Sequence, residues 1–270
     1  MLPTVFPPVH FNVYGYRTMK KSIVVTGAGQ GIGAAIARLL AEQGYSLLLL
    51  GRHLTALENT RESIKNPEAH QSFSCDIRQP EQIGEALAQS KIQSLYAVVA
   101  NAGKGGENHY SEEDPWQEII DTNLTGSYFT VQECLPFLKK HPAPYKKIVI
   151  ISSILARLGV PGYSAYCASK AGLLGLMRSL AAELTADKIL VNAICPGWVN
   201  TAMAHEGLEG FADALHTSRE EAYRQAMAQV PLGKMSEPEE IAHLVSFLFS
   251  DAQSSFTGQT FDINNGALMP

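Results

Sequence analysis

Tyr166 and Lys170 are the residues whose types and spacing point most directly to chemistry. Residues four apart share one face of a helix, so the phenol and the ammonium can interact. A free tyrosine has a pKa of about 10, which is too high for efficient proton exchange at neutral pH. At ~4 Å and an effective dielectric constant of ~20, an ammonium stabilises a phenolate by about 4 kcal/mol. We therefore expect Lys170 to bring the pKa of Tyr166 close to neutrality and Tyr166 to exchange protons.

A glycine-rich turn near the start of the chain offers a second kind of chemistry. Gly27, Gly31 and Gly33 fit the spacing GxxxGxG, and Ile32 rules out the form GxGxxG. Between a strand and a helix, the backbone amides and the helix dipole can hold a pyrophosphate that no Cβ atom obstructs. The turn is a weak signal by itself because such turns are common. Together with the tyrosine and lysine it predicts dinucleotide binding at these three glycines and Ile32.

Elements of alternating type must position these residues. From residue 21 onward, short β-branched or leucine-rich runs alternate with amphipathic segments, a pattern typical of βαβ units. Strands are expected over residues 22–26, 45–50, 70–75, 95–100, 147–151, 190–194 and 259–263. The pattern predicts an α/β fold, a Rossmann-type doubly wound seven-stranded parallel sheet flanked by helices. Ligands of such sheets bind beyond the carboxyl ends of the strands, where the polar and glycine-containing turns lie.

Two segments stand apart from this alternation. Met19 followed by two lysines is a natural start, so residues 1–18 are interpreted as an extension. This extension is a start codon assigned too far upstream, a remnant of an expression vector or a genuine tail. Residues 19–270 are expected to form a single domain. Residues 200–232 are predicted to be a long irregular loop after a strand end. We expect this loop to cover the substrate, with a plain surface insertion as the alternative.

Composition excludes several classes of protein. The 270 residues are 46% apolar and carry a net charge of -5, with no long basic run, so neither nucleic acid nor an anionic membrane is an expected partner. No apolar run is long enough to span a bilayer. The four cysteines have no paired spacing and the histidines form no HExxH motif, so we predict no metal and reduced thiols in the cytoplasm. A soluble, cytoplasmic protein is the expectation.

The order of the motifs closely resembles the short-chain dehydrogenase/reductase family from residue 21 to residue 266. By that resemblance Ser153 hydrogen-bonds the substrate oxygen, Tyr166 supplies or removes its proton, and Lys170 also holds the nicotinamide ribose. Asn123 matches the catalytic asparagine, whose backbone positions a water for proton relay to Lys170. Thr201 resembles the residue that contacts the nicotinamide amide or phosphate. The remaining predicted cofactor positions are Asn101, Ala102, Gly103, Pro196 and Gly197.

The chain departs from the family pattern at two points. Ala100 precedes Asn101 where two asparagines are usual, and Asn264 stands where an aspartate is usual. Neither change removes a catalytic group. Residues 231–241 resemble the branch that contains 3-oxoacyl carrier-protein reductases and sugar or polyol dehydrogenases. A 3-oxoacyl thioester or a related ketone is therefore the first expectation for the substrate.

Arg52 predicts the choice of coenzyme. Enzymes that use NAD place an acid after the second strand to bind the ribose 2′-hydroxyl, whereas this turn carries Arg52 and no carboxylate. A guanidinium can meet the 2′-phosphate of NADP with a planar, charge-assisted pair of hydrogen bonds. Asp76 comes too late for this role and, by resemblance, flanks the adenine. Gln30 occupies a spot where many NADP-dependent relatives carry a second basic residue.

Two other classes of function stay open beside an NADP-dependent oxidoreductase that acts on a carbonyl or alcohol. A regulatory protein of the same fold would bind the dinucleotide without turnover, but it would have no chemical need for Asn123, Ser153, Tyr166 and Lys170 together. An isomerase or dehydratase that uses the nucleotide transiently would share the tyrosine and lysine. The resemblance also implies a homotetramer or homodimer, with helices near residues 115–139 and 163–184 at a two-fold interface.

Overall fold

The computed structural model describes residues 21–269, so the expectation for residues 1–18 lies outside the described range. Within it, seven parallel strands form one sheet in the order β3-β2-β1-β4-β5-β6-β7. The strands are β1 (Ser22–Thr26), β2 (Ser46–Gly51), β3 (Gln71–Ser74), β4 (Ala97–Ala100), β5 (Lys146–Ile151), β6 (Ile189–Pro196) and β7 (Thr260–Ile263). All seven predicted strands are confirmed, with ends shifted by at most two residues.

The sheet reverses its direction of growth between β1 and β4. Val24 of β1 pairs with Leu48 of β2 on one side and with Val98 of β4 on the other. The chain therefore builds β2 and β3 outward in one direction and β5 to β7 in the other, which defines a doubly wound sheet. Such a switch point opens a crevice at the carboxyl ends of the strands. The predicted fold class is confirmed.

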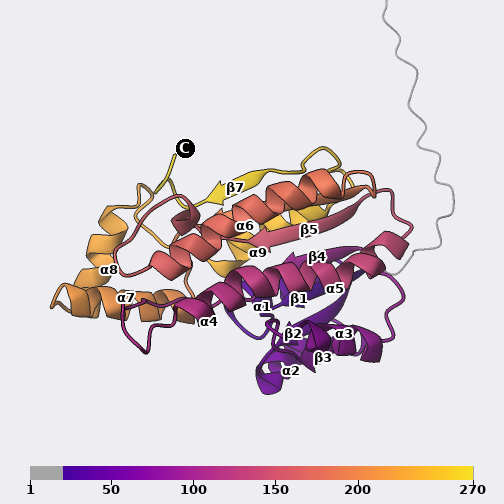
Figure 1. Ribbon diagram of the computed structural model, residues 1–270, viewed down its shortest axis with the longest axis horizontal. Coiled ribbons are helices and arrows are strands. Elements are labelled where there is room, and N and C mark those ends of the chain that lie inside the picture. The colour runs from indigo at the N-terminus through magenta and orange to yellow at the C-terminus, as the bar shows by residue number, and fades with distance from the viewer. Residues whose placement is uncertain (1–20, 270) are drawn as a thin grey trace, which may run out of the picture.

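Helices cover both faces of the sheet (Figure 1). Apolar residues of α3, α5 and α6 pack on one face, and those of α1, α2 and α9 pack on the other. The helices are α1 (Gly31–Glu42), α2 (Leu54–Ser63), α3 (Pro80–Gln89), α4 (Trp116–Ile120), α5 (Gly126–Lys140), α6 (Ser164–Glu183), α7 (Ala202–Ala214), α8 (Arg219–Ala228) and α9 (Pro238–Phe249). Short 3₁₀ turns span Pro67–Ala69 and Ile154–Ala156.

Alternating side chains of the central strands explain the two layers. In β1, Val24 joins the apolar cluster on one face, while Ile23 and Val25 join the cluster on the other, and all three are fully buried. Burying a side chain of this kind contributes roughly 1.5–3 kcal/mol. A strand buried on both faces reads as a continuous apolar run, which is why the sequence reveals it so clearly.

The expectation of an irregular loop over residues 200–232 is wrong, because α7 and α8 occupy most of it. Each helix has a side-chain N-cap that sequence periodicity did not reveal. The Thr201 hydroxyl accepts a hydrogen bond from the Ala204 amide at 3.3 Å, and the Ser218 hydroxyl accepts one from the Glu221 amide at 3.2 Å. The two helices bury a small apolar cluster of their own around Leu208. Figure 1 places them beside one another at one end of the molecule.

Candidate active site

The turn between β1 and α1 is shaped by glycines. Gly27 and Gly31 have positive φ values of 66° and 52°. A Cβ atom on Gly33 would lie 2.2 Å from the carbonyl oxygen of Gly27 and 2.6 Å from Nδ2 of Asn101. No side chain fits there, so the backbone amides at the start of α1 stay open to a ligand. Such a cradle suits the pyrophosphate of a dinucleotide. Ile32 lies in the same first turn of α1.

Thr26 joins this turn to the end of β4. Its hydroxyl accepts hydrogen bonds from the amides of Asn101 and Ala102, both at 3.0 Å. The Asn101 side chain donates to the Thr26 carbonyl oxygen at 2.9 Å. Sequence reasoning found Asn101 and Ala102 but missed Thr26. A hydroxyl residue at the last position of a buried strand was the available signal.

The end of β6 lies on the other side of the glycine turn. A Cβ atom on Gly31 would lie 3.2 Å from Cγ2 of Thr201, so the predicted nicotinamide contact adjoins the cradle. The Gly197 amide, directly after Pro196 at the end of β6, donates to the Ile263 carbonyl oxygen at 3.0 Å. The structure thus brings the predicted positions after β1, β4 and β6 to one edge of the sheet.

Arg52 and Asp76 lie toward the β2 and β3 side of that edge. Arg52 is exposed just after β2, and the Ser74 hydroxyl donates to its carbonyl oxygen at 3.0 Å. The pKa of Asp76 is lowered chiefly by hydrogen bonds from the Arg78 side chain, and the charge of Arg52 contributes less. Arg78 holds both carboxylate oxygens of Asp76 at 2.6–3.0 Å and lies 3.8 Å from Glu118. Sequence reasoning missed Arg78.

Tyr166 and Lys170 occupy one face of α6, as their spacing predicts. The Lys170 ammonium lies 5.5 Å from the centre of the Tyr166 ring and donates to the Ile151 carbonyl oxygen at 3.0 Å. Ser153, just after β5, hydrogen-bonds Tyr166, and its oxygen also accepts from the Leu155 amide at 3.1 Å. β5 therefore ends in the carbonyl group that holds the lysine, and the serine follows two residues later.

Asn123 completes this group from an unusual piece of helix. The predicted helix near residues 115–139 is interrupted by a π-helical turn, Asp121–Thr125, which sequence reasoning did not foresee. The Asn123 side chain accepts from the Lys104 amide at 2.7 Å and donates to the Lys104 carbonyl oxygen at 3.0 Å. π-Helical turns often occur at functional sites.

Gly103 marks the place where Asn123 and Lys170 meet. A Cβ atom there would lie 3.2 Å from Oδ1 of Asn123 and 3.5 Å from Nζ of Lys170. The Asn123 side chain also donates to the Ser169 hydroxyl at 3.0 Å, which ties the asparagine to α6. The four predicted catalytic residues are therefore assembled at one place, next to the glycine cradle.

The expected pKa of Tyr166 is wrong for this structure. Burial raises the pKa of Tyr166 to about 12, and the hydrogen bond with Ser153 acts in the opposite direction. Burial also lowers the pKa of Lys170, to about 8. An ammonium ~4 Å from the phenol would lower its pKa if desolvation were left out. In the structure the ammonium is directed at the Ile151 carbonyl oxygen, and desolvation dominates both groups.

Asn108 is a further residue that sequence reasoning missed. It is 4% exposed, and its Oδ1 accepts from the Ala165 amide at 2.9 Å and from the Ser164 hydroxyl at 3.1 Å. Its own amide donates to the Gly162 carbonyl oxygen at 2.7 Å. Asn108 thereby holds the loop after β4 against the start of α6, directly before Tyr166. No local pattern distinguishes it from any other loop asparagine.

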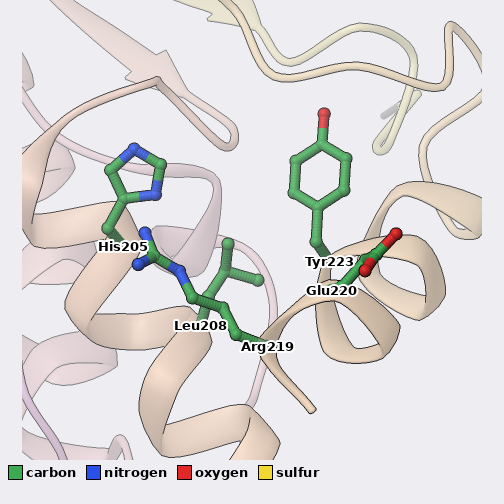
Figure 2. Close-up of a pocket in the computed structure, with 5 residues that line it drawn as sticks. All are labelled: His205, Leu208, Arg219, Glu220 and Tyr223. Carbon is green, nitrogen blue, oxygen red and sulfur yellow. The ribbon is translucent and has the colours of Figure 1, made fainter.

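A hollow of about 420 Å³ lies between α7 and α8, lined by His205, Leu208, Arg219, Glu220 and Tyr223 (Figure 2). The Arg219 side chain extends toward the side of the hollow where His205 lies, and Tyr223 stands on the opposite side. None of the predicted site residues lines this hollow. The hollow is therefore separate from the group around Tyr166.

Over residues 21–269, no cluster of three or more histidine, cysteine, aspartate or glutamate side chains is arranged to hold a metal ion. Over the same residues, no helix combines the length and the apolar character needed to cross a bilayer.

The class of protein follows from fold and site, and comparison with known proteins agrees. A family model described as enoyl-(acyl carrier protein) reductase matches residues 27–267. The 3-oxoacyl-(acyl-carrier-protein) reductase FabG of Rickettsia conorii is 34% identical over 252 residues, which cover 92% of this chain and 97% of that protein. The chain belongs to the short-chain dehydrogenase/reductase family and is an oxidoreductase, as the resemblance implied.

Solved structures give the same result. A variant of actinorhodin polyketide ketoreductase with NADPH superposes with a TM-score of 0.86 at 31% identity, covering 92% of this chain and 97% of the other. The ligand-free aldohexose dehydrogenase of Thermoplasma acidophilum gives a TM-score of 0.78 at 26% identity, covering 92% of this chain and 94% of the other. The two structures differ in the substrates that their names state. Membership of the family therefore does not identify the substrate.

Proposed function

We propose that this protein is an NADP-dependent oxidoreductase that interconverts a ketone and a secondary alcohol, with Tyr166 as the acid and base. The observation that carries the proposal is the assembly of Asn123, Ser153, Tyr166 and Lys170 beside the glycine cradle. Bound NADPH supplies the hydride for reduction. A regulatory protein that only senses the dinucleotide would have no need for this arrangement.

Each of the four residues has a role that its contacts support. Ser153 offers its hydroxyl to the substrate oxygen next to Tyr166. Tyr166 gives its proton to that oxygen during reduction and takes it back during oxidation. Lys170, buried with a lowered pKa, is suited to replace the proton and to hold the ribose of the cofactor. Asn123 holds the loop after β4 in place through Lys104.

The glycine cradle and Arg52 support the choice of coenzyme. Gly27, Gly31 and Gly33 leave room for a pyrophosphate. Arg52 is exposed after β2, near Asp76, at the end of the site where adenosine would lie. A guanidinium there attracts a 2′-phosphate by its charge, whereas a 2′-hydroxyl offers only a neutral hydrogen-bond acceptor. The NADPH-bound ketoreductase of the same family adds support for NADP.

A 3-oxoacyl thioester or a related ketone is the proposed substrate. The reductase from Rickettsia conorii acts, by its name, on a 3-oxoacyl group, and the structural relative with the higher TM-score is a ketoreductase. The test is to screen purified protein with NADPH against 3-oxoacyl thioesters, simple ketones, sugars and quinones. NADPH oxidation that depends on a ketone is expected. Dinucleotide binding with no turnover of any of these compounds would favour the sensor instead.

We also propose a homotetramer, with a homodimer as the smaller alternative. α4 and α5 expose large apolar side chains, since Trp116 is 42% and Tyr128 45% exposed. On α6, a Cβ atom at Gly175 would meet no atom within 4 Å. An open glycine on an exposed helix face lets another helix approach closely. These features support an interface formed by α4, α5 and α6.

A further inference from the structure

Glu107 lies between the helix that carries Tyr166 and the helix α7 that follows β6. A Cβ atom on Gly210, in α7, would lie 3.3 Å from Oε1 of Glu107. A Cβ atom on Gly162, just before α6, would lie 3.8 Å from its carboxyl carbon. The carboxylate therefore spans the gap between the start of α6 and the middle of α7. None of the roles assigned above uses it.

The residues on both sides of Glu107 contact the neighbouring helices. The adjacent Asn108 is buried and makes hydrogen bonds of 2.7–3.1 Å to Gly162, Ser164 and Ala165. On the other side, a Cβ atom on Gly105 would lie 3.0 Å from Cγ of Met203 in α7. The loop that carries Glu107 is therefore in contact with α6 on one side and with α7 on the other.

Tyr163 connects Glu107 to the proposed reaction centre. It lies three residues before Tyr166, one helical turn away, and is partly buried. Burial raises the pKa of Tyr163, and the neighbouring Glu107 carboxylate, which accepts its hydrogen bond, raises it further. Tyr163 in turn is one of the weaker causes that raise the pKa of Tyr166, behind burial. Glu107 therefore lies beside the start of α6, the helix that carries Tyr166, with Tyr163 between them in the chain.

We propose that Glu107 and Tyr163 form a substrate subsite that selects ketones with a hydrogen-bond donor near the reacting carbonyl and disfavours ketones with an anionic group there. A hydroxyl or amide N–H can donate to the Glu107 carboxylate, whereas a second carboxylate is repelled by it. This inference rests on the proposed function and narrows its substrate class to neutral ketones that carry such a donor.

Two probes of similar acyl structure test the subsite. Acetoacetate carries an anionic carboxylate, and acetoacetamide, of nearly the same shape, is neutral and carries amide N–H groups at the same position. For Glu107→Gln we expect KM for acetoacetate to fall about 10-fold and KM for acetoacetamide to rise several-fold, with kcat nearly unchanged. Glu112→Gln, an exposed carboxylate of the same loop, is the matched control and should change neither value.

Tyr163→Phe gives a second test of opposite sign. Removal of the hydroxyl leaves Glu107 without its neutral donor, so KM for acetoacetate divided by KM for the neutral probe should increase several-fold. A folding defect cannot lower this ratio in Glu107→Gln and raise it in Tyr163→Phe. Changes of equal size for both probes, or effects confined to kcat, would overturn the subsite.

Binding measurements separate failure of this inference from failure of the proposed function. In Tyr166→Phe protein saturated with NADPH, the dissociation constants of both probes can be measured by calorimetry without turnover. A ratio of the two constants that shifts about 10-fold or more on adding Glu107→Gln supports the subsite, whatever the turnover assay gives. A ratio that stays constant refutes it, even if the enzyme reduces both ketones.

Discussion

The Lys170 ammonium is buried and donates to the carbonyl oxygen of Ile151 at 3.0 Å. Burial removes the water that would otherwise stabilise this cation, and it lowers the pKa of Lys170 from 10.5 to about 8. Between these two values the unfolded chain binds more protons than the folded one, so the contribution of Lys170 to stability rises with pH in that range. At pH 7 both states are protonated and the penalty of about 3 kcal/mol is fully present.

Lys170→Met should therefore stabilise the fold while abolishing turnover. After loss of the hydrogen bond to Ile151, a net gain of about 1–2 kcal/mol is expected at pH 7, shrinking toward pH 10. Urea unfolding of both proteins at the two pH values measures this. Burial also lowers the pKa of Lys147 to about 8. Because Lys147 is present in both proteins, its contribution to the pH dependence cancels in the difference. A variant less stable at pH 7, or a difference that does not change with pH, would contradict the prediction.

Tyr166→Phe should reduce turnover by at least about 10³-fold and leave NADPH affinity within about 3-fold, since proton transfer is lost and the glycine cradle is untouched. Steady-state rates and fluorescence titration with NADPH measure the two effects. Tyr110→Phe, at a phenol 95% exposed, is the matched control. Near-native turnover by the first variant would exclude Tyr166 as the acid and base.

Arg52→Ala should weaken NADPH binding by roughly 10- to 100-fold, the equivalent of a charge-assisted hydrogen bond of about 1.5–3 kcal/mol. NADH binding should barely change because NADH lacks the 2′-phosphate. Arg38→Ala, at an exposed arginine of α1, controls for the loss of positive charge. Equal losses for the two coenzymes, or equal affinities of the unmodified protein for both, would show that Arg52 does not read the phosphate.

Gly175→Phe tests the proposed interface. The site faces open space within the chain, so the fold should tolerate the ring, while a partner helix packed at this face would be displaced. Light scattering is expected to give four times the mass of one chain for the unmodified protein and a smaller assembly for the variant, with unchanged circular dichroism. A monomer before substitution would refute the interface, and so would a variant that keeps the full assembly.

The sequence by itself determined the class of fold and the residues of the proposed site. The strands are buried on both faces, so their apolar runs are local and continuous, and β1 matches its prediction residue for residue. The spacing of Tyr166 and Lys170 is likewise local, because four residues make about one turn of α6. Gly27 and Gly33 were identifiable because the backbone segments around them approach so closely that only glycine fits.

The tertiary structure decided what depends on contacts between distant segments. Asn108 meets Ser164 across 56 residues of sequence, and Thr26 meets Asn101 across 75. The pKa of Tyr166 was misjudged for the same reason, because desolvation arises from everything packed around a group rather than from its neighbours in the chain. The π-helical turn at Asn123 and the subsite at Glu107 also depend on packing between elements, which no local pattern encodes.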